Sequence, residues 1–355
     1  MGQHLKVLTL EDDFLEYSRL FAEIKDKSVY FLPSYLRSVQ RAEKYPLKIM
    51  VFFERDKIAM IPYIKRRIND LLLFRELKHE LWDIITPHEY SYAICNVTDW
   101  AERNCLIQQL FRHVADYCRK ENIVSEFVRF DPFLTDTKCL EPHYTLKKAC
   151  DNIYINLRKD NAEIFKDFHY SVKKNINRAL TCGLTFCQSD GNDDDVDLFV
   201  KLYLASMQRL KANDYFYFSV DYFRALIKDC EGSSLFIVRN KSNQPIAASI
   251  LLHYGDIGHH HLTGYVSETE LLRPNDYMIY SLINWGKSNH LQYLHLGGGA
   301  LSICKFKAKF SNERIPYYVG YRVHIQEAYQ LLCDIWRKEN NLSQLAEYFP
   351  LYRLK

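Results

Sequence analysis

The chain of 355 residues has no uninterrupted apolar run that approaches a membrane span, and its N-terminus carries acidic residues where a secretory leader would have an apolar core. Its 10 cysteines are scattered, with no C-x-x-C pair and no pair of pairs that suits zinc. We therefore expect free thiols, no metal site and a cytoplasmic location. The net charge of +3 excludes a bulk nucleic-acid binder, so we expect no DNA partner.

The most informative segment, Leu291–Tyr321, contains three consecutive glycines after a short apolar strand. The glycines let the backbone take positive φ and approach a ligand closely. Phe306 and Phe310 can share one face of a helical turn, which places Lys307 beside the glycines. A bare backbone at a strand end with a neighbouring cation suits an anionic ligand or a developing oxyanion. A glycine turn followed by a solvated basic helical turn remains the alternative.

Apolar periodicity predicts short strands mixed with helices in both halves. Lys48–Phe53 and Lys57–Ile64 read as a hairpin, and Trp100–Lys120 has helical spacing. In the second half we predict a helix over Asn161–Thr181 and three antiparallel strands between Ser234 and Tyr265. This order of elements predicts an α+β fold.

The two halves share the order strand, helix, meander, helix and strand, which suggests a structural duplication. We expect a first domain over 1–150, a second over 151–325, and a helical tail over 326–355 that packs back on the body. The boundary should lie near residues 145–155, where a charged stretch interrupts the pattern.

Several short motifs follow one another in a fixed order in the second half. They are Tyr170–Ala179 (YSVKKNINRA), Gly183-Leu184, Arg209 before Tyr215–Phe218 (YFYF), Ser219–Phe223 (SVDYF), Pro274–Tyr277 (PNDY), and the glycine turn with Phe306-Lys307 and Phe310. This order resembles the Fem family of non-ribosomal aminoacyl transferases and the FemAB-like acyltransferases of cell-envelope gene clusters. Weaker matches in the first half are Asp83–Tyr92 (DIITPHEYSY) and Phe127–Pro132 (FVRFDP).

The resemblance implies two GNAT-like domains in tandem, with mixed, largely antiparallel sheets flanked by helices. It also implies a bacterial N-acyltransferase that moves an aminoacyl or acyl group onto an amine of a cell-envelope precursor. That precursor is a peptidoglycan peptide or an amino sugar for a surface polysaccharide. No bound cofactor is implied, and the acyl donor is aminoacyl-tRNA or acyl-CoA.

Two departures from the family pattern matter. The first-half stretch usually continues with glycines, but this chain has Glu89, Ser91 and Ala93 there. No glycine-rich pyrophosphate loop follows Tyr265, where coenzyme-A-dependent GNAT enzymes carry one. The absence of this loop weakens the case for acyl-CoA as the donor, because such a loop binds the phosphates of coenzyme A through its backbone N–H groups. The Fem enzymes also lack the loop and use charged tRNA.

The resemblance assigns roles to single residues. Lys307 matches the lysine that Fem enzymes place beside the reacting ester, and Arg209 would contact the phosphates of a nucleotide-linked acceptor. Arg209 could instead cap a helix end. Tyr215 and Tyr217 could stack a sugar or a base, although core packing is as good an explanation.

Other candidates have plain alternatives too. Tyr265 could supply a polar group at a strand end, or be an ordinary strand-end aromatic. Asp131 could bind the acceptor amine, although Asp-Pro is also common turn chemistry. The candidate catalytic residues are Lys307, Tyr265 and Asp131, and the candidate substrate-binding residues are Arg209, Tyr215, Tyr217, Gly297, Gly298, Gly299, Phe306 and Asn275.

The run His259-His260-His261 invites a metal interpretation. In a regular strand only His259 and His261 share a face, and two histidines make an incomplete site, so we favour strand residues that line the cleft or the sheet. A basic helix that includes Lys173, Lys174 and Arg178 could contact tRNA phosphates, but a solvated helix face is the commoner explanation.

Two rival functions remain at this point. One is an acyl-CoA-dependent GNAT N-acetyltransferase, and the other is a catalytically silent tandem-GNAT scaffold that binds a partner. The expected partners are a small-molecule or nucleotide-linked envelope precursor and, as one candidate, charged tRNA. No transmembrane segment is expected, and contact with a membrane surface stays open.

Overall fold

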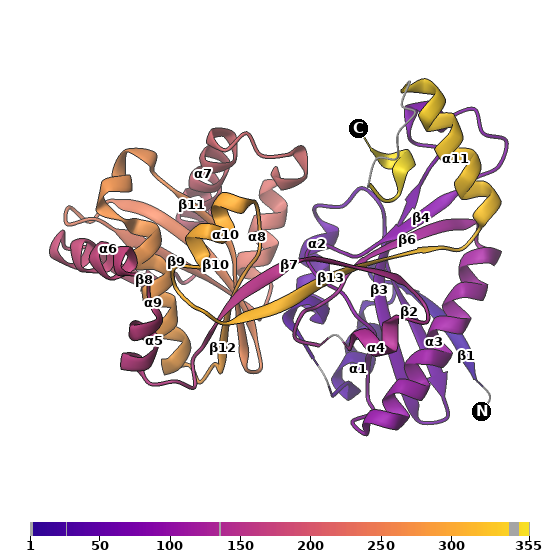
Figure 1. Cartoon of the computed structure of the whole chain (residues 1–355), viewed down its shortest axis with the longest axis horizontal. Coiled ribbons are helices and arrows are strands. Elements are labelled where there is room, and N and C mark those ends of the chain that lie inside the picture. The colour runs from indigo at the N-terminus through magenta and orange to yellow at the C-terminus, as the bar shows by residue number, and fades with distance from the viewer. Residues whose placement is uncertain (1–2, 26, 135, 341–347, 355) are drawn as a thin grey trace. The chain divides into compact units, whose positions relative to one another are not determined.

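The computed structural model describes residues 3–25, 27–134, 136–340 and 348–354. Its contacts divide the chain into two units (Figure 1). The first unit comprises Met1–Leu36, Glu43–Ala149 and Tyr317–Lys355, and the second comprises Arg37–Ala42 and Cys150–Pro316. Residues 317–325, which we expected in the second domain, thus belong to the first unit.

The first unit contains a mixed sheet. Its strand order is β1 (His4–Thr9), β2 (Leu47–Glu54), β3 (Lys57–Arg67), β4 (Trp82–Ile85), β6 (Ile123–Arg129) and β13 (Arg314–Val323). Neighbours are antiparallel except β4 and β6, which run parallel. The short β5 (Ile94–Cys95) pairs with β3. Because β13 pairs with β6 through Val319–Val323, this part of the chain completes the first sheet.

Helices of the first unit follow local sequence signals. They are α1 (Phe14–Glu23), α2 (Pro33–Gln40), which continues into the second unit, α3 (Trp100–Lys120), α4 (Thr137–Leu140) and α11 (Gln326–Glu339). Asp99 caps α3 by accepting a hydrogen bond from Glu102 N, and the apolar stripe of this helix is buried. The α3 helix packs on β1, β2 and β3.

The C-terminal part of the chain is fastened to the first unit. Trp336 of α11 is buried in a cluster with Phe74 and Tyr352. The Nε of Arg353 donates to Asp83 Oδ2 at 2.6 Å, and the Nε of Arg66 donates to Asp83 Oδ1 at 2.8 Å. A buried carboxylate on β4 therefore holds the end of the chain through a charge-assisted hydrogen bond.

The second unit repeats the arrangement of the first. Its sheet has the order β8 (Thr185–Gln188), β9 (Ser233–Arg239), β10 (Pro245–Tyr254), β11 (Ile257–Tyr265), β12 (Tyr293–Gly297) and β7 (Thr145–Asn156). Again a single neighbouring pair, β11 and β12, is parallel, and the other pairs are antiparallel. The predicted α+β class is confirmed.

Six α-helices of the described residues belong wholly to the second unit. They are α5 (Asn161–Asp167), α6 (Tyr170–Thr181), α7 (Asp193–Arg209), α8 (Val220–Lys228), α9 (Pro274–Ser288) and α10 (Leu301–Lys307). Apolar residues of α6 and α9 pack with Phe236 and Val238 of β9. The alternate residues Leu235 and Ile237 are also buried, so both faces of this sheet are covered.

The predicted single helix over Asn161–Thr181 is wrong, because the structure has two helices there. Phe168 is extended and buried between them, and the ring of the next residue, His169, caps α6 by accepting a hydrogen bond from Ser171 N. Burial of one aromatic ring thus interrupts a segment whose composition favours a continuous helix. Within the described residues, none of the helices has the length and hydrophobicity that crossing a bilayer requires.

The α7 helix lies unusually close to β11. A Cβ placed on Gly264 would lie 2.4 Å from the carbonyl carbon of Leu202 and from the nitrogen of Tyr203. The hydroxyl of Ser206, which is 2% exposed, accepts a hydrogen bond from Tyr265 N at 3.2 Å. Only a glycine on β11 allows this backbone-to-backbone approach.

We predict that Gly264→Ala destabilises the protein by about 1–3 kcal/mol, because backbone cannot move aside as a flexible side chain can. Urea unfolding of the purified variant measures the loss. The matched control is Gly255→Asn, at a glycine with φ +57° and no neighbour within 4 Å, where asparagine tolerates the backbone and should change stability by less than about 0.5 kcal/mol. Equal stability of Gly264→Ala and the wild type would contradict the prediction.

Candidate functional site

The parallel strands of the second unit separate at their C-terminal ends. Pairing joins Ile257–His259 of β11 to Tyr293–His295 of β12, and the two strands make no further pairs within the described residues. Beyond that point β11 continues beside β10, whereas β12 enters the glycine turn. Unpaired backbone at the C-terminal ends of neighbouring parallel strands is a common location for ligands in α/β sheets.

Each glycine of the turn has a different constraint. Gly297 and Gly299 have φ of +74° and +132°, which favour glycine. Gly298 does not have positive φ, so the expectation that its own backbone needs that region is wrong. A Cβ at Gly298 would instead lie 2.7 Å from Asn152 Oδ1 and 2.8 Å from Cys150 Sγ. A side chain at position 298 would therefore have to displace the side-chain ends of Asn152 and Cys150 on β7.

Lys307 is held against this turn. It is the last residue of α10, and its Nζ donates to the Gly298 carbonyl at 2.7 Å. A Cβ on Gly297 would lie 3.6 Å from the same nitrogen. Phe306 packs edge-on against the buried Phe310 at a centroid distance of 5.4 Å. This aromatic anchor keeps the short helix, and with it the ammonium group, beside the turn.

The histidines of β11 do not follow a regular strand. Leu251 pairs with His260 and Ile250 pairs with Leu262, so His261 is the extra residue of a β-bulge. The expected alternation of faces does not continue past His260. Instead, His260 and Thr263 lie on one face, where His260 Nε2 and Thr263 Oγ1 are 2.8 Å apart.

The histidines of β11 are buried, at His259, or half-buried, at His260 and His261. Burial, then the charge of Lys307, and then His261 lower the pKa of His260 to about 3, so its ring is neutral at physiological pH. On the other side, His259 Nδ1 and His295 Nδ1 are 3.0 Å apart, and both rings are buried. One of these two rings must donate and the other must accept.

Arg209 and Tyr265 lie together near the end of β11. The guanidinium carbon of Arg209 is 4.3 Å from the centroid of the Tyr265 ring. The same guanidinium donates weakly to Tyr265 O at 3.5 Å and to Ser206 Oγ at 3.4 Å. Arg209 is the exposed last residue of α7, so the group is accessible to an anion.

The aromatic segment after α7 is exposed. Tyr215 and Tyr217 are each 44% exposed, and Phe216 is 39% exposed. Core packing therefore does not explain the two tyrosines. The Tyr215 ring makes an edge contact with Phe216 at 5.3 Å, which fixes its orientation.

The start of α9 is not arranged as a phosphate loop. The preceding segment Ser267–Leu272 is a 3-10 helix without glycine. Asp276 in the first turn accepts a hydrogen bond from Asn175 Nδ2 at 3.0 Å, and burial raises the pKa of its carboxyl. Asn275 Oδ1 is buried without a hydrogen-bond partner among the described residues. A carboxylate at this helix N-terminus opposes the binding of another anion.

Asp131 belongs to the first unit. It is 1% exposed, and its Oδ1 accepts a hydrogen bond from Phe133 N at 2.9 Å. Burial raises the pKa of this carboxyl, while hydrogen bonds from Phe133 N and Ser28 oppose the rise. The contact with Phe133 is that of an Asp-Pro turn, and the contact with Ser28 comes from another part of the first unit.

The parallel strands of the first unit are rejoined beyond their ends. After β4, Ser91 N donates to Arg129 O at 2.8 Å, and Asp131 N donates to Ser91 O at 3.1 Å. Ser91 and Phe130 form an isolated parallel bridge. The backbone between the strand ends is therefore satisfied by the chain itself, unlike the parted ends of β11 and β12.

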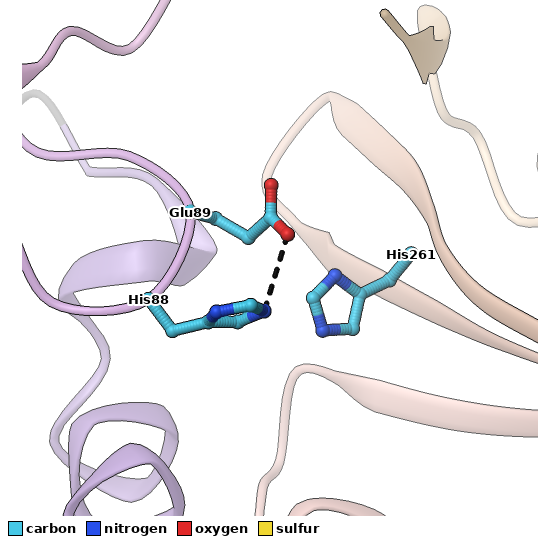
Figure 2. A group of neighbouring side chains, drawn as sticks. All are labelled: His88, Glu89 and His261. Carbon is cyan, nitrogen blue, oxygen red and sulfur yellow. Dashed lines mark ion pairs between the residues drawn. The ribbon is translucent and has the colours of Figure 1, made fainter. Parts of the chain in front are cut away.

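The loop between β4 and Ser91 is tightly held. The Arg129 guanidinium donates to the carbonyl oxygens of Glu89, at 2.8 Å, and of Thr86, at 3.2 Å. Glu89 has φ +73°, a strained conformation for a non-glycine residue. Its carboxylate lies 3.2 Å from the Nε2 of the buried His88, as Figure 2 shows.

The second unit thus contains every candidate site residue except Asp131. It brings Lys307 against the glycine turn and places Arg209 on Tyr265. Sequence reasoning expected the run His259–His261 to line the cleft or the sheet but gave His260 no role, and it missed Thr263 and Asn152. Their side chains meet through strand register and a bulge, and no local motif signals either.

Comparisons with known proteins bear on the fold of the chain. Residues 166–308 match the family model of the acetyltransferase (GNAT) domain. No curated protein matches the sequence. The crystal structure of FemX matches with a TM-score of 0.65 and 13% identity, covering 92% of this chain and 99% of FemX.

Two other solved structures have the same fold. A domain assigned as the C-terminal domain of a lysylphosphatidylglycerol synthetase from Agrobacterium fabrum has a TM-score of 0.57 and 14% identity, and the match covers 88% of this chain and 92% of that domain. The L-PGS structure from Bacillus licheniformis has a TM-score of 0.55 and 13% identity, covering 87% of this chain and 91% of that one. Residues 166–308 thus match the acetyltransferase (GNAT) domain, and the chain has a GNAT-type fold that it shares with FemX.

Proposed function

We propose that the second unit is an N-acyltransferase that moves an acyl or aminoacyl group onto an amine of a cell-envelope precursor. The observation that carries the proposal is the contact between Lys307 and the glycine turn at the parted end of β12. A GNAT domain at residues 166–308 supports acyl transfer as the class of reaction.

The arrangement meets the requirements of that reaction. The amine nitrogen attacks the acyl carbon, the bond from that carbon to sulfur or oxygen breaks, and the amine proton ends on the leaving group. Negative charge develops on the carbonyl oxygen in between. An ammonium group fixed beside a bare glycine backbone can stabilise that charge without reorganising, because its position is set by α10 and the Gly298 carbonyl.

The donor can be an acyl thioester or an aminoacyl ester, since both present the same carbonyl to the amine. The GNAT family model favours a coenzyme A thioester. The glycine-free segment before α9 and the carboxylate of Asp276 weigh against the usual contact with its pyrophosphate. The two donors are therefore separate arms of the assay below.

The acceptor is proposed from Arg209 and the exposed aromatic residues. Arg209 presents a cation on the ring of Tyr265, and Tyr215 and Tyr217 offer exposed rings. A cation beside aromatic faces suits a phosphate linked to a sugar or base. One structural neighbour is named for lysylphosphatidylglycerol, an aminoacylated lipid, which supports an envelope precursor as the acceptor class.

The assay combines purified protein with one donor and one acceptor and detects the amide product by mass spectrometry. The donors are a panel of acyl-CoAs and charged tRNAs, and the acceptors are a UDP-linked muropeptide and UDP-linked amino sugars. Product from one donor class only identifies the donor. Absence of product from every pair, with binding of precursor intact, would favour a scaffold and contradict the proposal.

We predict that Lys307→Ala lowers single-turnover acyl transfer at least about a hundredfold, equivalent to roughly 3 kcal/mol of barrier, because an oxyanion donor is lost. Folding stability should fall by only about 1 kcal/mol, the contribution of one hydrogen bond. The matched control is Lys305→Ala on the same helix, whose exposed side chain should be neutral in both measurements. Unchanged turnover in Lys307→Ala would remove the central residue of the proposal.

We also predict that Gly298→Ala displaces the turn, because its methyl group would meet Asn152 and Cys150 at less than 3.0 Å. Turnover should fall by about tenfold, with a stability loss of only about 1 kcal/mol, because the two contacts are with side-chain ends rather than with backbone. Adding Cys150→Ala removes one of the two contacts and should restore part of both losses. A double variant no better than Gly298→Ala would show that Cys150 does not limit the turn.

A further inference from the structure

A chain of hydrogen bonds runs from the interior of the second unit to the parted strand end. Ser249 Oγ donates to Leu262 O at 3.2 Å and lies 2.8 Å from Thr263 Oγ1. Thr263 Oγ1 in turn lies 2.8 Å from His260 Nε2. Ser249 is fully buried on β10, and His260 is half-buried on β11. The chain therefore begins at a carbonyl in the sheet and ends at an imidazole.

The carbonyl at one end sets the direction of the protons. A carbonyl oxygen only accepts, and each hydroxyl has one proton to donate. If Ser249 donates to Leu262 O, then Thr263 must donate to Ser249, and His260 Nε2 must donate to Thr263. This direction satisfies all three contacts, whereas the reverse direction leaves the Leu262 contact without a proton. The imidazole of His260 thus carries its proton on Nε2, and its Nδ1 is unprotonated and able to accept a hydrogen bond.

His260 occupies the position where the two strands part. The last paired residues are His259 and His295, so His260 is the first residue of β11 beyond the pairing. The bulge at His261 turns the strand there. The groups that act electrostatically on His260 are Lys307 and His261, and together with burial they keep the ring neutral. A neutral ring beside a fixed ammonium group is a hydrogen-bond acceptor that does not become a cation.

We propose that His260 binds the acceptor amine, with Nδ1 accepting an N–H hydrogen bond that points the nitrogen lone pair at the acyl carbon. Thr263 and Ser249 are positioning residues, because they hold the ring and its tautomer. The proposal rests on the proposed function and adds the residue that selects the nucleophile. No proton needs to move to His260, since the amine proton leaves with the leaving group.

The charge at the site explains why a neutral amine would be selected. Lys307 repels an ammonium ion, whereas the lone pair of Nδ1 attracts the N–H of a neutral amine. Acyl transfer needs the neutral amine, because the protonated form has no lone pair. Lys307 and His260 would thus act on different atoms, Lys307 on the carbonyl oxygen and His260 on the nucleophile.

The tautomer can be tested without any substrate. Nitrogen-15 NMR of histidine-labelled full-length protein distinguishes protonated from unprotonated ring nitrogens, and His260→Gln identifies the signal. We expect an unprotonated Nδ1 and a protonated Nε2, unchanged between pH 8 and pH 5. Thr263→Val should mix the two tautomers. A protonated Nδ1 in the wild type, or no effect of Thr263→Val, would overturn the inference.

The kinetic test uses two variants that each keep one end of the imidazole. His260→Asn retains a polar group near the position of Nδ1, whereas His260→Gln retains one near Nε2 and the contact with Thr263. We expect His260→Gln to lower turnover on the order of a hundredfold and His260→Asn to lose much less. Thr263→Val should raise the KM for the amine while leaving the KM for the donor unchanged.

The outcomes separate this inference from the proposed function. Equal activity of His260→Gln and wild type, with Lys307→Ala inactive, would overturn the role of His260 and leave acyl transfer intact. A greater loss in His260→Asn than in His260→Gln would show that Nε2 is the functional end and would also overturn it. If the wild type transfers no acyl group, the proposed function fails, and the NMR experiment still decides the tautomer.

Discussion

The candidate site depends on the point at which β11 and β12 stop pairing. Two parallel strands that stay hydrogen-bonded satisfy each other's backbone, and they leave no room between them for a ligand. Here the pairing ends at His259 and His295, and three structural features of the chain lie around that point. The glycine turn exposes backbone, α10 supplies the ammonium of Lys307, and the bulge at His261 brings His260 within hydrogen-bond distance of Thr263.

The first unit has the same topology, but its two parallel strands stay connected beyond their ends. It has the same order of strands and a single parallel pair, β4 and β6. A loop leaves the end of β4, is held by Arg129, and rejoins β6 at Ser91. Hydrogen bonds within the unit satisfy the backbone groups of this loop. One carboxylate oxygen of Asp131 accepts a hydrogen bond from Phe133 N in the turn that follows. A duplicated fold therefore need not carry two equal sites, because function resides in local geometry.

Packing of α7 connects the core of the second unit to its surface groups. Gly264 lets the helix backbone approach β11, and Ser206 then reaches Tyr265 N. The last turn of α7 consequently ends over the end of β11, which is why Arg209 lies on the Tyr265 ring. The placement of this exposed cation thus follows from a constraint on one buried glycine rather than from the arginine itself.

Local patterns in the sequence determined a large part of this description. Apolar runs indicated the hairpin of β2 and β3 and the strands of β9 to β11. The helical turn expected at Lys307 is present as α10, although Phe310 lies beyond the end of that helix. These features depend on residues a few positions apart, so they can be predicted from local propensity and periodicity. The order of the motifs predicted a FemAB-like fold, because each motif reports one local feature and their order combines many of them.

Only the tertiary structure decided the remaining features, and they share one physical reason. The break between α5 and α6 follows from burial of Phe168, and the crowding at Gly298 comes from Asn152, about 150 residues earlier in the chain. The bond between His260 and Thr263 exists because a bulge shifts the register against β10. Each is a contact between segments that are distant in sequence, so its free energy is set by packing and register, which short-range patterns do not encode.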